Sequence, residues 1–272
     1  MQIAEVITLL ERWYPPSLAE SWDNTGFLLG QRDRVASRIM TCLTLTPDVA
    51  AEAIKQRVDL IVSHHPILFG GVNRLTSDRP DSSALLSLVQ AGISVYSPHT
   101  SFDSAAEGIN AWLIAKLGVK NAIPLTPSED DPAIGAGRIG QLGQPVLLSE
   151  LADKLIIMTG SEGTHVVGDP VHEVSVVAVA CGAAGSMLGD ATKAGADVFI
   201  TGEMRFHDCL TARSTGVSLL LPGHYATERP AVEAMAGRLA YELDDVESFA
   251  SRVEADPMRW RAAPQQATSL TE

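Results

Sequence analysis

Short runs rich in Val, Ile and Leu alternate along this chain with stretches typical of helices, and this alternation restricts the fold more than any other feature of the sequence. Such apolar runs, bounded by turn residues, are typical of strands buried on both faces in parallel sheets covered by helices. The sequence therefore predicts an α/β protein. The expected strands cover residues 38–44, 59–63, 93–96, 174–180, 197–201 and 217–221. The expected helices are an N-terminal helix ending near Pro15 and residues 47–56, 82–91, 104–117, 185–194, 207–215 and 230–240.

The two halves of the chain follow the same order of elements. Residues 56–63 align without a gap to residues 194–201, and beyond a connection of different length the alignment also pairs two His-x3-carboxylate segments. Identity across the halves is low, so chance resemblance between two strand–helix–strand units remains an alternative. If the duplication is real, the loops at the carboxyl ends of the parallel strands of both lobes face one cleft.

These features predict two similar α/β lobes related by an internal duplication, with the metal site in the cleft between them. The first lobe is expected to cover residues 1–123 and the second residues 124–256, followed by a C-terminal tail of residues 257–272. The polar, turn-rich segment 123–131 is the expected linker. The glycine-rich segment 135–143 is expected to form a strand-turn region that joins the second lobe.

Residues of metal-binding type follow several of the expected strands. They are His64, His65, His99, Asp103, His224 and Glu228. The first two are adjacent at the end of an apolar run, and the others form the two His-x3-carboxylate segments. Imidazoles and carboxylates gathered in this way are what a water-activating two-metal centre requires.

Each of these residues also has a simpler interpretation. A histidine at a strand end is often structural, and adjacent histidines on a strand point to opposite faces unless the backbone turns, which Pro66 favours. Asp103 precedes the capping-box sequence 104–107 and could serve that helix N-terminus instead. Glu228 precedes Pro230, which suits the first position of a helix, so Glu228 is expected on a loop, facing the cleft or acting as a partner of the helix dipole.

The remaining histidines have weaker support. His207 lies at an expected helix start beside Asp208 and is a candidate for proton transfer or substrate contact. His165 and His172 have no partner at ligand spacing and are expected to have structural or surface roles.

Charge and composition narrow the classes of function. A formal net charge of -13 and a pI near 4.9 argue against a nucleic-acid-binding surface, because phosphate contacts need clustered Lys and Arg. The three cysteines are isolated, which is typical of reduced thiols and argues against a CxxC zinc ribbon. No apolar stretch has the length of a membrane span, and the N-terminus lacks the features of a signal peptide. A cytoplasmic protein is expected.

Five segments resemble, in order, the motifs of the GTP cyclohydrolase 1 type 2 family, also called Nif-three-like dinuclear metal proteins. They read ESWDNTG (20–26), SHHP (63–66), HTSFD (99–103), GADVFITGE (195–203) and GHYATE (223–228). The resemblance covers most of the chain and implies two lobes with a dinuclear metal site between them, assembled as a toroidal hexamer. It implies the metal ligands His64, His65, Asp103, His224 and Glu228, with Glu228 as the bridge, and His99 as a nearby catalytic residue. This chain has Phe206-His207 where the family often has two histidines, which puts a role for the first of that pair in doubt.

Together these features suggest metal-assisted hydrolysis of a nucleotide or a related small molecule, and the family name implies GTP. Two divalent ions would activate water, and their mixed nitrogen and oxygen ligands suit Zn, Mn, Fe, Co or Ni without choosing among them. His99 or His207 would transfer a proton. The alternative is a non-enzymatic metal-binding scaffold or regulatory protein, whose ions hold the two lobes and the subunits together.

Overall fold

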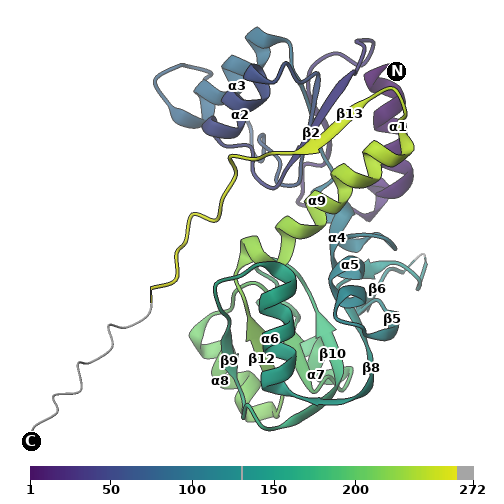
Figure 1. Ribbon diagram of the computed structural model, residues 1–272, viewed down its shortest axis with the longest axis vertical. Helices are drawn as coiled ribbons and strands as arrows, with labels where there is room; N and C mark the ends of the chain where they lie inside the picture. Colours follow the sequence, from purple (N-terminus) through teal and green to yellow (C-terminus); the bar gives the residue numbers. More distant parts are fainter. Residues whose placement is uncertain (130, 262–272) are drawn as a thin grey trace, which may run out of the picture.

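The computed structural model describes residues 1–129 and 131–261 and shows an α/β protein built on two main sheets (Figure 1). The helices of the described chain are α1 (Ile3–Trp13), α2 (Pro47–Lys55), α3 (Pro80–Ala91), α4 (His99–Ser104), α5 (Ile109–Lys116), α6 (Leu148–Thr159), α7 (Leu188–Lys193), α8 (Phe206–Thr215) and α9 (His224–Glu242), with short 3-10 turns η1 (Pro16–Leu18) and η2 (Gly185–Met187). The strands are β1 (Gly26–Leu29), β2 (Arg38–Cys42), β3 (Leu60–Ser63), β4 (Ser94–Ser97), β5 (Lys120–Ile123), β6 (Thr126–Pro127), β7 (Gly135–Ala136), β8 (Arg138–Leu147), β9 (His165–Val167), β10 (Glu173–Val179), β11 (Val198–Ile200), β12 (Ser218–Leu221) and β13 (Glu247–Ala250). The predicted α/β class is confirmed.

The first sheet has the strand order β1-β4-β3-β2-β13. Its strands β13, β2, β3 and β4 run parallel, and β1 is antiparallel to β4. Strands β2, β3 and β4 correspond to three of the predicted apolar runs, and every residue of β3 and β4 is buried. Because helices cover such a sheet on both faces, its inner strands can be continuously apolar.

The second sheet has the order β5-β8-β10-β11-β12-β9. Strands β10, β11 and β12 are parallel and correspond to the other predicted runs, whereas β8 and β9 flank them in antiparallel orientation. The glycine-rich segment 135–143 forms β7 and part of β8. The expected linker 123–131, of which residue 130 lies outside the described chain, includes β6, which pairs with β7. The predicted tail is described only as far as residue 261.

The two sheets share one four-strand unit, β1-β4-β3-β2 in the first and β9-β12-β11-β10 in the second, with matching strand directions. The carboxylate of Asp59, just before β3, accepts hydrogen bonds from two backbone N–H groups beside the start of β2, at 2.8 and 3.0 Å. Asp197, just before β11, accepts two near the start of β10, both at 2.8 Å. These aspartates are paired by the ungapped sequence alignment. The common topology and contacts support the internal duplication, which stays a proposal.

The C-terminal part of the chain returns to the first sheet. Helix α9 runs from the second sheet toward the first and packs on β2 and β13 (Figure 1), and β13 pairs with β2 in parallel. The predicted division, with residues 124–256 in one lobe, therefore does not match the sheet membership of residues 247–250. The sequence of β13, Glu-Ser-Phe-Ala, contains no Val, Ile or Leu run that could have predicted a strand.

The helix expected at residues 104–117 is divided into α4 and α5, so Asp103 lies inside α4 and not before a capping box. The division falls before Gly108, whose N–H donates to the carbonyl of Ala105. A Cβ at Gly108 would lie 1.8 Å from the carbonyl oxygen of Phe102. Only glycine fits this close turn, and the capping-box pattern gave no sign of it.

The helix expected at residues 230–240 begins earlier, at His224, so Glu228 lies in α9 and not on a loop. Pro230 is inside this helix, where it removes one N–H donor and disfavours the preceding helical turn. Thr227, Glu228 and Arg229 are nevertheless buried. Tertiary packing of this first part of α9 therefore outweighs the local preference of proline.

Within the described chain, every helix is too short or too polar to span a bilayer.

Candidate metal centre

The paired histidines follow β3 directly and continue its hydrogen bonding. The N–H groups of His64 and His65 donate to the carbonyls of Cys42 and Leu43, both at 2.9 Å, beside the end of β2. The Ser97 hydroxyl donates to the carbonyl of His64 at 2.7 Å. The two imidazoles lie on the same side of the turn, with ring centroids 5.0 Å apart. The turn predicted after the strand thus brings both side chains to one place.

The two His-x3-carboxylate segments are both helical, and each follows a parallel strand. In α4, which follows β4, His99 is the first residue and Asp103 is the last but one. In α9, which follows β12, His224 and Glu228 lie in the first two turns. Residues four positions apart lie on the same face of a helix. A His and a carboxylate can therefore point into one site from each helix.

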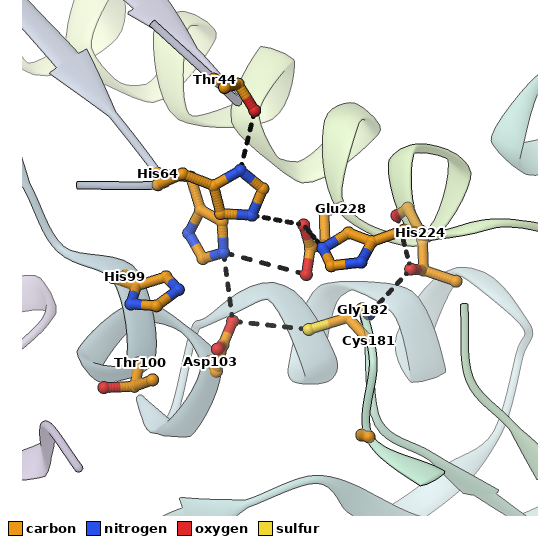
Figure 2. Close-up of polar contacts among 12 residues, drawn as sticks. Thr44, His64, His99, Thr100, Asp103, Cys181, Gly182, His224 and Glu228 are labelled. Atoms are coloured by element: carbon orange, nitrogen blue, oxygen red, sulfur yellow. Dashed lines mark hydrogen bonds and ion pairs between the residues drawn. The ribbon is translucent and has the colours of Figure 1, made fainter. Parts of the chain in front are cut away.

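The side chains of the strand ends and the two helices converge at one centre, as Figure 2 shows. The carboxylate of Glu228 approaches Nε2 of His65 at 3.2 Å and Nε2 of His224 at 3.0 Å. Nε2 of His64 lies 3.7 Å from Asp103 and 3.9 Å from Glu228. Residues far apart in the sequence thus place imidazole nitrogens around two carboxylates.

Two groups of three side chains are spaced closely enough to hold a metal ion. One group is His64, His65 and His99, and the other is His65, His224 and Glu228, with ligand atoms within 4.8 Å of one another in each. His65 belongs to both groups. Two adjoining groups with a shared member are compatible with two neighbouring ions.

Several polar atoms at the centre are buried without a hydrogen-bond partner among the described residues. They are both ring nitrogens of His64, Nε2 of His224 and Oε2 of Glu228, so the short contacts between them do not have hydrogen-bond geometry. Buried polar atoms without partners are costly, unless an ion or water satisfies them. Imidazole nitrogens and carboxylate oxygens are ligands of divalent transition metals. The donor set therefore fits a metal centre.

Burial and mutual interaction shift the pKa values at the centre in opposite directions. Burial lowers the pKa of His64 to about 3, which keeps its imidazole in the neutral form that binds metals. Contact with Glu228 raises the pKa of His224 to about 9. Burial alone raises the pKa of Glu228, but His224, His65 and His64 together bring it below its ordinary value. Burial and the charge of Glu228 raise the pKa of Asp103 well above its ordinary value. A bound cation would favour the ionised form of both carboxylates.

The centre opens into a cavity of about 540 Å³. His65, His99, Asp103, His224 and Glu228 all contribute to its lining, whereas His64 is only 1% exposed. A volume in this range suits a small molecule. A compound bound in the cavity would contact the candidate ligands directly.

The family model of Duf34/NIF3 (NGG1p interacting factor 3) matches residues 1–257. The chain belongs to this family. It is 36% identical over 268 residues to the Protein NIF3 homolog of Schizosaccharomyces pombe, covering 92% of this chain and 95% of that protein. It is 30% identical over 261 residues to the GTP cyclohydrolase 1 type 2 homolog of Clostridium perfringens, covering 96% and 100%. A solved Bacillus cereus protein related to NIF3 has the same fold, with a TM-score of 0.88 at 20% identity over 96% of this chain and 99% of that one.

In this Duf34/NIF3 chain, a carboxylate orients His99. Nδ1 of His99 lies 2.7 Å from Asp23, whose other oxygen accepts hydrogen bonds from the backbone N–H and hydroxyl of Thr100. His99 also has a positive φ of 30°, which is unusual for a residue other than glycine. The strained backbone and the buried carboxylate together fix the ring, as is typical of histidines at metal sites. Asp23 belongs to the ESWDNTG segment, but sequence reasoning assigned it no role.

Three further side chains orient the candidate ligands. The Thr44 hydroxyl lies 2.8 Å from Nδ1 of His65, and Oε1 of Glu203 lies 3.1 Å from Nδ1 of His224. The Cys181 thiol donates to Oδ1 of Asp103 at 3.4 Å, and burial raises the pKa of this thiol well above its ordinary value, so it stays protonated. Such contacts fix the rotamer and tautomer of ligands. Thr44 is the last residue of the predicted strand 38–44, and Cys181 and Glu203 closely follow predicted strands, so a position near a strand end was the available signal.

The other histidines lie away from the centre of this Duf34/NIF3 chain. His207 is exposed at the start of α8 beside the ring of Phe206, and it does not line the central cavity. The structure does not bring it together with the other predicted residues, and its catalytic role stays a prediction. His165 packs on Trp260, with ring centroids 4.7 Å apart, and His172 is exposed.

Proposed function

We propose that this Duf34/NIF3 protein is a dinuclear metal-dependent hydrolase that acts on a nucleotide or a related small molecule. The observation that carries the proposal is the convergence of three imidazoles, those of His64, His65 and His224, on the carboxylates of Asp103 and Glu228, beside a cavity of about 540 Å³. A relative of this chain is named GTP cyclohydrolase 1 type 2 homolog, which supports a nucleotide as substrate. The net charge of -13 would repel an anionic substrate unless cations were bound in the cavity.

The ligands would be His64, His65, Asp103, His224 and Glu228. Glu228 is the natural bridge, because its two oxygens lie nearest to imidazoles on different sides of the centre: Oε1 to His64 and Oε2 to His65 and His224. The chemistry that two divalent cations supply at such a site is a water of lowered pKa and a polarised scissile group. Because Glu228 lies in α9 with its carboxylate already beside the imidazoles, it would reach bound metal without a loop movement.

The proton-transfer residue would be His99. Asp23 contacts Nδ1 of its ring, which leaves Nε2 available to accept or donate a proton at the reacting group. The ring of His99 is 5.2 Å from that of His64 between their centroids, and His99 lines the cavity. A base in this position touches both the cavity and the candidate metal ligands.

The test compares metal-loaded protein with chelator-treated protein. The metal content of protein purified without an affinity tag is measured first, followed by turnover of a panel of nucleotides by both forms. We expect close to two ions per chain and chelator-sensitive hydrolysis of at least one compound. Fewer than two ions in fully loaded protein would contradict the dinuclear centre.

A metal-binding scaffold is the second candidate function, and one observation favours it. The candidate ligands come from both halves of the chain, from β3 and α4 on one side and α9 on the other, so bound ions would cross-link them. A large rise in melting temperature on metal loading, with no turnover of the panel, would support the scaffold over the enzyme. The toroidal hexamer and the cytoplasmic location also stay predictions, and light scattering in solution tests the hexamer.

A further inference from the structure

We propose that Trp22 is an aromatic platform on which a planar ring of the ligand stacks, at the mouth of the cavity that holds the candidate metal centre. This inference rests on the proposed function, because the metal centre would hold the remaining, anionic part of the same ligand. The platform itself is defined by contacts that do not involve a metal.

Trp22 is exposed at the cavity although its side chain is large and apolar. It is 59% exposed and contributes to the lining of the cavity together with His65, His99 and Glu228. Phe69, which packs beside it, is 56% exposed. Exposed aromatic side chains gathered at a cavity with convergent polar groups are typical of ligand-binding surfaces.

The backbone on both sides of Trp22 is tied down. The N–H of Glu20 donates to the Thr100 hydroxyl at 3.0 Å, and the Asp23 carboxylate contacts His99 and Thr100. The Asn24 amide donates to the carbonyl of Leu68 in the neighbouring loop. An exposed indole on a fixed backbone loses little conformational freedom on binding, which is the physical advantage of a preorganised contact.

The two rings beside Trp22 do not stack on its indole. The Phe69 ring is tilted by 53° from the Trp22 ring at a centroid distance of 6.0 Å, so the two do not form a parallel slot. The His99 ring stands edge-on at 78° and 6.1 Å. Neither ring is parallel to the indole, so neither is stacked on it, and Trp22 remains 59% exposed and accessible to a ligand ring.

The platform lies one ring away from the candidate ligands. The His99 ring neighbours both, with its centroid 6.1 Å from that of Trp22 and 5.2 Å from that of His64. A small molecule stacked on Trp22 can therefore reach the centre with its other end. Because every planar heterocycle has a π-face, the platform selects for a ring and not for one particular base.

The experiment measures binding by calorimetry with metal-loaded protein and two probes that differ by a ring, guanosine 5′-monophosphate and ribose 5-phosphate. In the unchanged protein we expect the ring-bearing probe to bind more tightly. Trp22→Ala should weaken binding of guanosine monophosphate by roughly tenfold and leave ribose 5-phosphate unchanged. Trp22→Phe should retain most of the affinity. The matched control is Trp260→Ala, because Trp260 is 43% exposed but packs on His165 and does not line the cavity.

Three results would overturn the platform. The first is equal affinity of the two probes for the unchanged protein, and the second is an equal effect of Trp22→Ala on both probes. The third is a Trp22→Ala variant whose molecular mass in light scattering changes while its preference for the ring-bearing probe is kept, which would assign Trp22 to a subunit contact. Metal analysis of the same samples separates this inference from the proposed function. Two bound ions without ring preference would remove only the platform, whereas ring preference without bound metal would contradict the metal-dependent function alone.

Discussion

The strand ends of the two sheets have the same topology but carry different side chains. In the first sheet, β3 is followed by His64 and His65, and β4 leads to His99. In the second sheet, the positions that align with His64 and His65 after the equivalent strand β11 are Gly202 and Glu203, and β12, the equivalent of β4, leads to His224. The two halves thus match where β4 and β12 each lead to a histidine at a helix start, and they differ where the paired histidines after β3 are replaced by Gly202 and Glu203 after β11.

Gly202, and Gly182 after β10, make room for the start of α9. A Cβ at Gly202 would lie 2.6 Å from the carbonyl oxygen of Gly182 and 2.7 Å from Cα of His224. A Cβ at Gly182, which has a φ of +65°, would lie 2.3 Å from Oε1 of Glu228. The first half therefore supplies candidate ligands from the end of β3 and from α4, whereas the second half clears space after β10 and β11 and supplies its candidate ligands from α9 alone.

Removing the carboxylate of Glu228 on α9 should have the largest effect on metal binding. Glu228→Ala deletes a carboxylate that lies 3.9, 3.2 and 3.0 Å from the imidazoles of His64, His65 and His224, so we expect metal affinity to fall by more than about 100-fold and chelator-sensitive turnover to be lost. Metal content after dialysis is the measurement. The control on the same helix is Glu233→Ala, because that side chain is 62% exposed and pairs with Arg229 away from the imidazoles. Stoichiometric metal in Glu228→Ala would refute the bridging role.

Filling the cleared space in the second half tests the comparison directly. Gly202→Ala should lower the free energy of unfolding by about 2–3 kcal/mol and weaken metal binding, because backbone lies against the new methyl group on two sides. Gly237→Ala in α9, where a Cβ meets nothing within 4 Å, should raise that free energy by up to about 1 kcal/mol. Urea unfolding of both variants is the measurement. Equal stabilities would show that the glycine is not required for close packing.

Substitution of the carboxylates that orient the histidines, Asp23 in the first half and Glu203 in the second, should lower turnover to different extents. The Asp23 side chain is fully buried and that of Glu203 is 54% exposed. Asp23→Asn should therefore lower turnover by about 10–100-fold with metal retained, and Glu203→Gln should have a smaller effect. The tautomer of His99, observed by nitrogen NMR of labelled histidine, distinguishes an orienting role from general destabilisation. An unchanged His99 signal in Asp23→Asn would argue against it.

The smallest effects should come from the equivalent aspartates that brace the two sheets. Asp59→Ala and Asp197→Ala each leave two backbone N–H groups without their acceptor, so each should lower the free energy of unfolding by about 1–3 kcal/mol. Thermal unfolding compares them. A close match between the two losses would strengthen the proposed duplication, and a difference of several kcal/mol would weaken it.

The buried strands were predictable because the sheets are covered on both faces. A fully buried strand such as Leu60–Ser63 occurs in that setting, so a short apolar run in the sequence already indicates a strand that is covered on both faces. The candidate ligands were predictable because they follow such strands. The orienting residues Asp23, Thr44 and Glu203 were missed, since nothing in local sequence says which side chain will meet an imidazole across the fold.

Helix boundaries and sheet membership were the least predictable features. The proline at position 230 and the capping-box sequence after Asp103 both indicated helix starts, and both indications were wrong, because packing at Glu228 and the turn at Gly108 outweigh preferences worth only a few kcal/mol. The return of β13 to the first sheet depends on the long helix α9, which carries the chain across the molecule.

The amino-acid sequence alone determined the α/β class, the buried strands and the set of candidate metal ligands, because burial and ligand type are properties of local composition. Tertiary structure decided that four of these residues lie on the facing turns of two helices, and that imidazoles from one half surround a carboxylate from the other. Those arrangements depend on contacts between residues as far apart as His64 and Glu228, and only the packed chain brings them together.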